Sequence, residues 1–194
     1  MDKSAEKTKL LNSIRDANNK WNKDILIGVY GETAEEVEKD AQFVLSHIKN
    51  PYFVIPPPVN KKLNFEQQKE HYDGIFDRIT QPIFLYNNPS SFGNTELEPE
   101  LCAYLKKYPN FVGLKDSSES DDNKKEFLKH LDETCSISCG KEGSIGKFIQ
   151  MIPVEQRALA GVVPSISNVV NSFSVLWKYA LAGEDDKMIA LQKE

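Results

Sequence analysis

The stretches Pro82-Ile-Phe-Leu-Tyr-Asn-Asn-Pro89 and Phe111-Val-Gly-Leu-Lys-Asp-Ser-Ser118 decide the fold. Each begins with a short apolar run that stops at a polar, reactive side chain, Tyr86 in the first and Lys115 in the second. Continuous apolar runs are typical of strands buried on both faces, and an intervening helix makes two such strands parallel neighbours. The sequence therefore predicts a phenol and an amine side by side at the carboxyl ends of adjacent strands, where α/β folds build their sites.

Lys115 is the sharper of the two signals, because lysine is rarely buried without a partner and this one directly follows an apolar run. An amine in a low-dielectric site loses some preference for its charged form and can form a Schiff base with a carbonyl substrate. Tyr86 is the candidate proton relay, since a phenol both donates and accepts. The residues alone fit a structural interpretation equally well, in which Lys115 extends to solvent and Tyr86 caps the core.

The composition predicts a single domain, residues 1–194, large enough for a substantial core. The formal net charge of -5 argues against nucleic acid as a partner, and no apolar run approaches the roughly 20 residues that cross a bilayer. Residues 1–9 are polar and lysine-rich, unlike a secretory signal, so we expect a cytoplasmic location. Cys102, Cys135 and Cys139 match no common zinc or redox spacing and are interpreted as free thiols.

Apolar strand patterns and amphipathic helix patterns alternate along the chain. Strand starts recur every ~25–30 residues with a helix in each interval, which is the βα repeat of a parallel barrel or a doubly wound sheet. The expected strands are 24–29, 52–55, 83–86, 111–115, 136–139 and 160–163. The expected helices are 1–20, 34–48, 63–79, 99–107, 121–131, 144–151, one capped by Ser167 and Asn168 that runs to 183, and one from 185 onward. His47, His71 and His130 fall on these helices and are expected at the surface or in helix packing.

Tyr86-Asn-Asn-Pro89 at the end of one strand, followed by Gly113-Leu-Lys-Asp-Ser-Ser118 at the end of the next, resembles the pyruvate-dependent class I aldolase superfamily. Its best-known members are dihydrodipicolinate synthase and N-acetylneuraminate lyase, and the resemblance runs from about Asp24 to the end of the chain. It implies a (β/α)8 barrel, an imine between Lys115 and pyruvate, and proton transfer by Tyr86. It also implies a 2-keto acid substrate, no metal or organic cofactor, and a homo-oligomer, commonly a tetramer.

The strand count is two short of the eight in such a barrel, which typically needs ~250 residues. In the family, two strands precede the point that matches the start of this chain, and further helices follow the point that matches its end. We therefore expect an α/β fold that is a partial TIM barrel, an open arc of about six parallel βα units. Unpaired edges at Ile25–Val29 and Ala160–Val163 would make these 194 residues prone to aggregation on their own. We also expect them to be catalytically negligible, because the turn that holds the pyruvate carboxylate in the family is not found in them.

The resemblance assigns further residues to substrate binding. Ser117 matches a hydroxyl that can face the substrate, although such a residue equally often caps the following turn. Gly140 and Glu142 match the place where the lyase branch binds the polyhydroxy tail of its sugar acid. Val163 and Ser165, with Asn168, match the last strand end, where a carbonyl and a hydroxyl approach the pyruvate-derived atoms.

Four departures from the family pattern bear on the reaction. The lyase sequence Gly-x-Asp-Glu reads Gly140-Lys-Glu-Gly143 here, so one acid is absent. The Gly-[Thr/Ser]-Thr-Gly-Glu turn that holds the pyruvate carboxylate is also absent. Ser91 stands where dihydrodipicolinate synthase has an arginine suited to a dicarboxylate, and Pro58 and Val59 replace its tyrosine pair. We therefore favour cleavage of a 2-keto-3-deoxy sugar acid, most like N-acetylneuraminate lyase, over the synthase reaction or a truncated non-catalytic paralogue.

Overall fold

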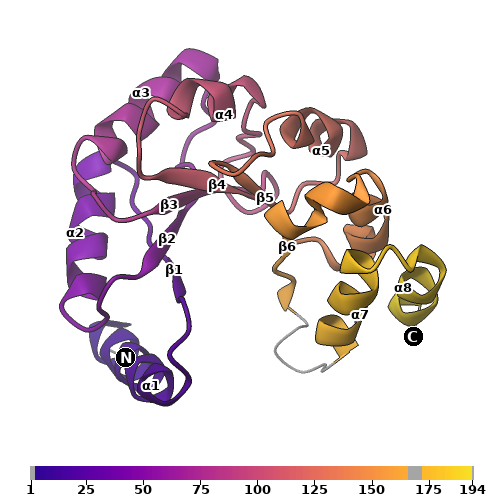
Figure 1. Ribbon diagram of the computed structural model, residues 1–194. Helices are drawn as coiled ribbons and strands as arrows, with labels where there is room; N and C mark the ends of the chain where they lie inside the picture. The colour runs from indigo at the N-terminus through magenta and orange to yellow at the C-terminus, as the bar shows by residue number, and fades with distance from the viewer. Residues whose placement is uncertain (1–2, 166–171, 194) are drawn as a thin grey trace.

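The computed structural model describes residues 3–165 and 172–193. Its strands form one six-stranded parallel sheet in the order β1-β2-β3-β4-β5-β6, so each strand pairs with the next one along the chain. Figure 1 shows this sheet curled into an open arc, with the helices on its outer side and β1 and β6 at opposite ends. The expected α/β partial barrel of six parallel βα units is confirmed.

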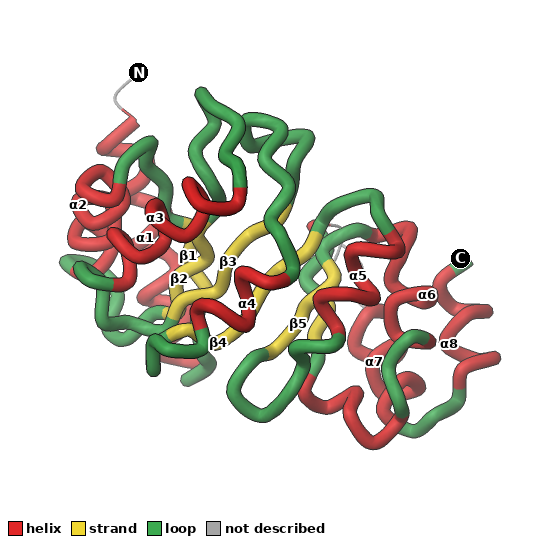
Figure 2. Tube along the Cα trace, turned by 90° about the horizontal axis from the view of Figure 1, so that it is seen from above, coloured by secondary structure: helices red, strands yellow, loops and turns green. Residues whose placement is uncertain are grey.

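The strands are β1 Leu26–Gly28, β2 Tyr52–Ile55, β3 Ile83–Asn87, β4 Phe111–Asp116, β5 Ser136–Cys139 and β6 Gly161–Val162. The α-helices are α1 Lys3–Trp21, α2 Ala34–Leu45, α3 Phe65–Phe76, α4 Glu100–Leu105, α5 Asp121–Leu128, α6 Ile145–Gln150, α7 Ser172–Leu181 and α8 Asp185–Gln192. Two short 3-10 helices, η1 Glu142–Ser144 and η2 Val154–Leu159, complete the order. Seen from above, the strands lie side by side with loops beyond their ends (Figure 2).

Most differences from the sequence-based expectation lie at element ends. The edge strands β1 and β6 are shorter than the apolar runs that predicted them, because each has a neighbour on one side only. Thr33 caps α2 as expected, accepting a hydrogen bond from the Glu36 amide at 3.3 Å. The expected cap at Ser167 and Asn168 lies outside the described residues, and η2 was not predicted.

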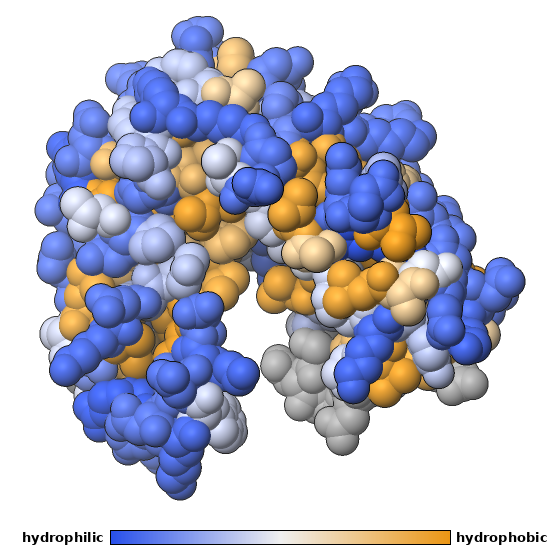
Figure 3. Space-filling view, viewed as in Figure 1, coloured by the Kyte–Doolittle hydropathy of each residue, from blue (hydrophilic) through white to orange (hydrophobic). Residues whose placement is uncertain are grey.

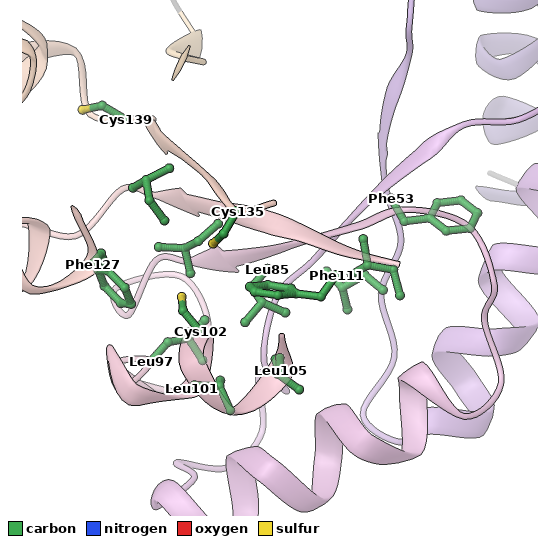
Figure 4. Packing of buried hydrophobic residues seen from close by; sticks show 14 of the residues in the cluster. Phe53, Leu85, Leu97, Leu101, Cys102, Leu105, Phe111, Phe127, Cys135 and Cys139 are labelled. Carbon is green, nitrogen blue, oxygen red and sulfur yellow. The ribbon is translucent and has the colours of Figure 1, made fainter. Parts of the chain in front are cut away.

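The apolar core lies between the outer face of the sheet and the helices. Leu85 of β3 and Phe111 of β4 pack with Leu101 and Leu105 of α4 and with Phe127 of α5 (Figure 4). All five are at most 4% exposed. Burial of this kind stabilises a fold by about 1.5–3 kcal/mol for each large apolar side chain, so this face anchors the arc.

The three cysteines are free and buried, in agreement with their interpretation as thiols. Two of them, Cys102 on α4 and Cys135 beside β5, direct their sulfur atoms toward one another in the core (Figure 4). A hydrogen bond that the Cys102 thiol donates to Cys135, together with burial, raises the pKa of the Cys102 thiol, which therefore stays protonated.

The histidines lie on or beside helices, as expected, and pack against neighbouring side chains. The ring of His47 lies 4.9 Å from that of Phe43, and the ring of His71 lies 5.2 Å from that of Tyr72. Burial lowers the pKa of His71 to about 4, and the pKa of His130 is lowered for the same reason. Within the described ranges, no helix combines the length and the apolar character needed to cross a membrane.

An irregularity in β4 sets the register of the central strands. Ile83 pairs with Phe111, but the next residue, Phe84, pairs with Gly113, so β4 contains one extra residue at this point. Gly113 has φ +150°, and a Cβ there would lie 2.8 Å from the carbonyl carbon of Ser136 and 2.9 Å from Cε1 of Phe84. Only glycine fits this bulge, because a side chain there would overlap with the neighbouring strands.

The exposed edge of β1 predicts self-association of this chain. Leu26 is 44% exposed on an edge strand with unpaired backbone groups, a combination that templates pairing between chains. Leu26→Lys should reduce self-association, measured by sedimentation velocity and light scattering, because a charged edge opposes strand pairing. Leu10→Lys on α1, where leucine is 59% exposed, is the matched control. An equal reduction by both variants would contradict a role for the strand edge.

Candidate active site

The structure brings Tyr86 and Lys115 together at the carboxyl ends of β3 and β4. The two residues are direct partners in the parallel register, and both side chains line the inner side of the arc. Lys115 Nζ lies 4.5 Å from the centre of the Tyr86 ring. Within the described residues, the Lys115 amine has no hydrogen bond and no ion pair, so nothing there competes with a substrate for it. The predicted adjacency of phenol and amine is confirmed.

Tyr86 is held by residues of the loop that follows β3. Asn88 Nδ2 donates a hydrogen bond of 3.1 Å to the Tyr86 hydroxyl, and Ser90 Oγ donates one of 2.9 Å to Asn88 Oδ1. The ring of Phe92 packs edge-on against Tyr86, with centroids 5.3 Å apart. These contacts fix the phenol without occupying its proton, because the hydroxyl is the acceptor in its bond with Asn88.

A cavity of about 440 Å³ opens in front of this pair. Among the described residues that line it, Lys115 alone is charged, and the polar side chains are those of Tyr30, Tyr86 and Ser138. The rest of the lining is apolar or glycine: Leu26, Gly28, Val29, Val54, Pro56, Phe84, Phe92 and Val163. Figure 3 shows hydrophobic residues along the inner surface of the arc, where this cavity lies. An amine in a mainly apolar cavity is a setting in which imine chemistry is feasible.

Behind the pair, a buried polar network ties the two strand ends together. Asn87, next to Tyr86, donates a hydrogen bond of 2.7 Å to Asp116, next to Lys115. Asp116 also accepts from the backbone and side chain of Ser118, and its carboxylate lies 3.7 Å from the Lys124 amine. Lys124 and Asp116 are each 1% exposed. Asn87 and Asp116, which lie on the outer face of the sheet, therefore fix the position of Tyr86 relative to Lys115 on the inner face.

Lys124 is almost completely buried, which is unusual for a lysine, and its amine finds all its partners inside the protein. Its amine donates to the Ser118 carbonyl at 2.7 Å and to the Ser120 carbonyl at 3.3 Å, in addition to the ion pair with Asp116. Asp121 lies 4.0 Å away as a second, partly exposed acid. Because all three donor positions have partners, Lys124 is a structural cation and does not compete with Lys115 as a nucleophile.

The other predicted substrate-binding residues divide into two groups. Gly140 and Ser117 adjoin Lys115, since a Cβ at Gly140 would collide with Ser117 Oγ and would lie 2.6 Å from Lys115 Cε. Val163 lines the same cavity and is 39% exposed. Glu142 and Ser165 lie outside the cavity lining and bind each other, with the Ser165 amide and hydroxyl donating to Glu142 Oε1 at 2.9 and 2.6 Å. Asn168 lies outside the described residues.

The positions that depart from the family pattern also lie outside the cavity lining. Ser91 is exposed in the loop after β3, and Val59 is 41% exposed after β2. The amides of Val59 and Asn60 donate to the Glu32 carboxylate at 3.2 Å each, and the Tyr30 hydroxyl contacts the same carboxylate. Glu32 therefore fastens the loop after β2, in addition to lying in the turn before α2.

Four residues of this site escaped the sequence analysis. Asn88 occupies the variable position of the Tyr-Asn-x-Pro motif, so nothing marked it as the partner of Tyr86. Asp116 and Lys124 belong to a network that connects β4 with a helix whose sequence is mostly charged. Ser138 had a usable signal, because the alternation in Ser136-Ile-Ser-Cys139 places Ser136 and Ser138 on one face of β5.

The described residues contain no group of three or more His, Cys, Asp or Glu side chains that could hold a metal ion. Independence from metals and organic cofactors stays a prediction. The fold and the site together define a protein of the parallel (β/α)-barrel class, with a lysine–tyrosine pair at the carboxyl edge of its sheet. The chain belongs to the dihydrodipicolinate synthetase family, whose model matches residues 5–194.

Solved structures share the fold at low sequence identity. A 2-keto 3-deoxygluconate aldolase from Picrophilus torridus is 20% identical with a TM-score of 0.84, over 98% of this chain and 65% of its own. The 4-hydroxy-tetrahydrodipicolinate synthase from Methylacidiphilum fumariolicum SolV is 21% identical with a TM-score of 0.83, over 96% of this chain and 60% of its own.

A prophage protein of the dihydrodipicolinic acid synthase family from E. coli K12, in complex with pyruvate, is 20% identical with a TM-score of 0.82. That match covers 98% of this chain and 62% of the prophage protein. The chain thus spans less than two thirds of the length of each of these structures.

The space above Gly140 provides a test of the site geometry. Gly140→Ala should displace the Lys115 side chain, because the new methyl group would overlap with Ser117 Oγ and Lys115 Cε. We expect reductive labelling of Lys115 by a keto acid and borohydride to fall by about 100-fold, the usual effect of a misplaced reacting group. Gly143→Ala is the matched control, since no atom lies within 4 Å of a Cβ there. Equal labelling of the two variants, both folded by circular dichroism, would refute the packing of Lys115 against Gly140.

Proposed function

We propose that this chain carries the catalytic edge of a pyruvate-dependent lyase that cleaves a 2-keto-3-deoxy sugar acid through a Schiff base on Lys115. The observation that carries the proposal is the Lys115 amine, which has no hydrogen bond or ion pair among the described residues and lies 4.5 Å from the centre of the Tyr86 ring in a mainly apolar cavity. Membership of the dihydrodipicolinate synthetase family and likeness in fold to a 2-keto 3-deoxygluconate aldolase support it. Among sugar-acid lyases, the sequence favours an activity most like that of N-acetylneuraminate lyase.

The mechanism begins when the neutral Lys115 amine attacks the C2 carbonyl of the keto acid and water leaves, which forms a protonated imine. Loss of the proton from the C4 hydroxyl breaks the C3–C4 bond, and the bonding electrons move toward the iminium nitrogen. The aldehyde product leaves and an enamine of pyruvate remains. Protonation at C3 and addition of water then release pyruvate and restore Lys115. Tyr86 moves these protons, with its hydroxyl oriented by Asn88.

No metal or organic cofactor enters this mechanism, because the protonated imine itself accepts the electrons of the broken bond. The proposed location is the cytoplasm, supported by three free thiols. Assembly into a homo-oligomer, which the family resemblance implies, is part of the same proposal.

The imine is tested by reductive trapping. Incubation with pyruvate and borohydride should leave a stable secondary amine on Lys115, located by peptide mass mapping, and Lys115→Arg should abolish the label. Tyr86→Phe should still permit some trapping, but in a complete barrel that contains this segment it should slow turnover by about 100-fold or more. A label on Lys141 or Lys147 in place of Lys115 would overturn the assignment of the nucleophile.

The rival reaction is condensation of pyruvate with aspartate semialdehyde, which the family name and several of the structural relatives make the natural alternative. Ser91 and Val59 argue against it, because neither supplies a charged or phenolic group for a second carboxylate and neither lines the cavity.

A complete barrel that carries this segment should therefore cleave a 2-keto-3-deoxy sugar acid faster than it condenses pyruvate with aspartate semialdehyde. Pyruvate release and semialdehyde consumption, measured side by side at matched enzyme concentration, decide between the two reactions. Efficient condensation without cleavage would reverse the ranking. Ser91→Arg, which adds a cation for a dicarboxylate, should shift the ratio toward condensation.

A further inference from the structure

We propose that Ser138 is a substrate-binding residue of this site, whose hydroxyl donates a hydrogen bond to the carboxylate of the keto acid held on Lys115. This inference rests on the proposed function, since it concerns the orientation of the same imine. No motif and no family correspondence assigned Ser138 a role, and it is reached from its position, its burial and its lack of a partner.

The position follows from the sheet register. Lys115 of β4 pairs with Tyr86 on one side and with Ser138 of β5 on the other. Residues that pair directly in a sheet project from the same face, so Tyr86, Lys115 and Ser138 form one row across three strands. All three line the same cavity. A molecule bound to the lysine therefore has the phenol on one side and the serine hydroxyl on the other.

Ser138 is a buried residue that faces the cavity, and its hydroxyl has no hydrogen-bond partner among the described residues. Ser138 is 7% exposed, and among the described residues no hydrogen bond joins its hydroxyl to another group. The next residue in the row, Gly161 of β6, leaves space in front of it, because a Cβ at Gly161 would lie 2.7 Å from Ser138 Oγ. A nearly buried hydroxyl usually has a hydrogen-bond partner, so this one is suited to bind a group that enters the cavity.

The other hydroxyls of the cavity are already engaged. Tyr30 contacts the Glu32 carboxylate. Tyr86 accepts a hydrogen bond from Asn88, and the proton that its hydroxyl keeps is the one that the proposed mechanism transfers. Lys115 is the one cation that the described residues contribute to the lining, and its amine is used in the bond to C2. A carboxylate attached to C2 therefore finds one hydroxyl donor in the lining that has no protein partner, that of Ser138.

The experiment measures reductive labelling of Lys115 in the full chain as a function of ligand concentration, with two probes. Pyruvate carries the carboxylate, whereas hydroxyacetone has the reactive carbonyl without it. Ser138→Ala should raise the half-saturating pyruvate concentration by roughly tenfold or more, the effect of a lost hydrogen bond to a charged group. Labelling by hydroxyacetone should be unchanged, and Ser138→Thr, which keeps the hydroxyl, should restore most of the response to pyruvate.

Ser136→Ala is the matched control, because Ser136 lies on the same strand but donates its hydroxyl proton to the Leu159 carbonyl at 2.7 Å. It should leave the labelling by both probes unchanged. If Ser138→Ala weakened pyruvate and hydroxyacetone equally, or affected neither, the role of Ser138 would be wrong while the imine on Lys115 stood. If pyruvate failed to label Lys115 in the unmodified chain, the proposed function itself would fall, and this inference with it.

Discussion

The inner site depends on the extra residue in β4. Ile83 pairs with Phe111, and without the bulge the same offset would set Tyr86 opposite Leu114 and turn Lys115 toward the helices. A shift of one residue moves every side chain of a strand to the other face, so the bulge decides which side chain enters the cavity. Gly113 makes it possible, because its φ of +150° and its closeness to the Ser136 backbone exclude a side chain. The backbone conformation at Gly113 thus determines that the Lys115 side chain reaches the cavity.

The outer face of the same two strands supplies the rigidity. Asn87 and Asp116 join the strand ends, and Lys124 closes the network from α5. Removing one member of a buried ion pair typically costs about 3–5 kcal/mol, because the remaining charge stays in a low dielectric. The Lys115 amine, which has no hydrogen bond or ion pair among the described residues, can remain available to a substrate because the neighbouring residues on the outer face hold the strands in place. Along β3 and β4, the inward-facing Tyr86 and Lys115 are available to a substrate, and the outward-facing Asn87 and Asp116 next to them stabilise the strand ends.

The alternation of apolar strands and amphipathic helices was sufficient to predict six parallel units, and two strand-end motifs predicted the contact of Tyr86 with Lys115. The buried lysine could not be predicted, because Lys124 lies in a segment whose charges indicate a solvated helix. Its burial follows from the position of α5 over Asp116, which is a tertiary property. The position of Ser138 on the inner face could have been predicted from the two-residue period of β5. That its hydroxyl has no partner among the described residues could not, because this depends on which side chains of other strands lie near it.

The agreement between strand order and chain order has a consequence for biosynthesis. Each strand finds its partner after one intervening helix, so no strand waits for a distant part of the chain to be made. The ribosome adds about 5–20 residues per second, far slower than helices form or short loops close. Each βα unit can therefore dock on its predecessor as it emerges from the exit tunnel. β3 with Tyr86 therefore leaves the tunnel before β4 with Lys115, and until β4 follows, the edge of β3 is unpaired and prone to pair with other chains.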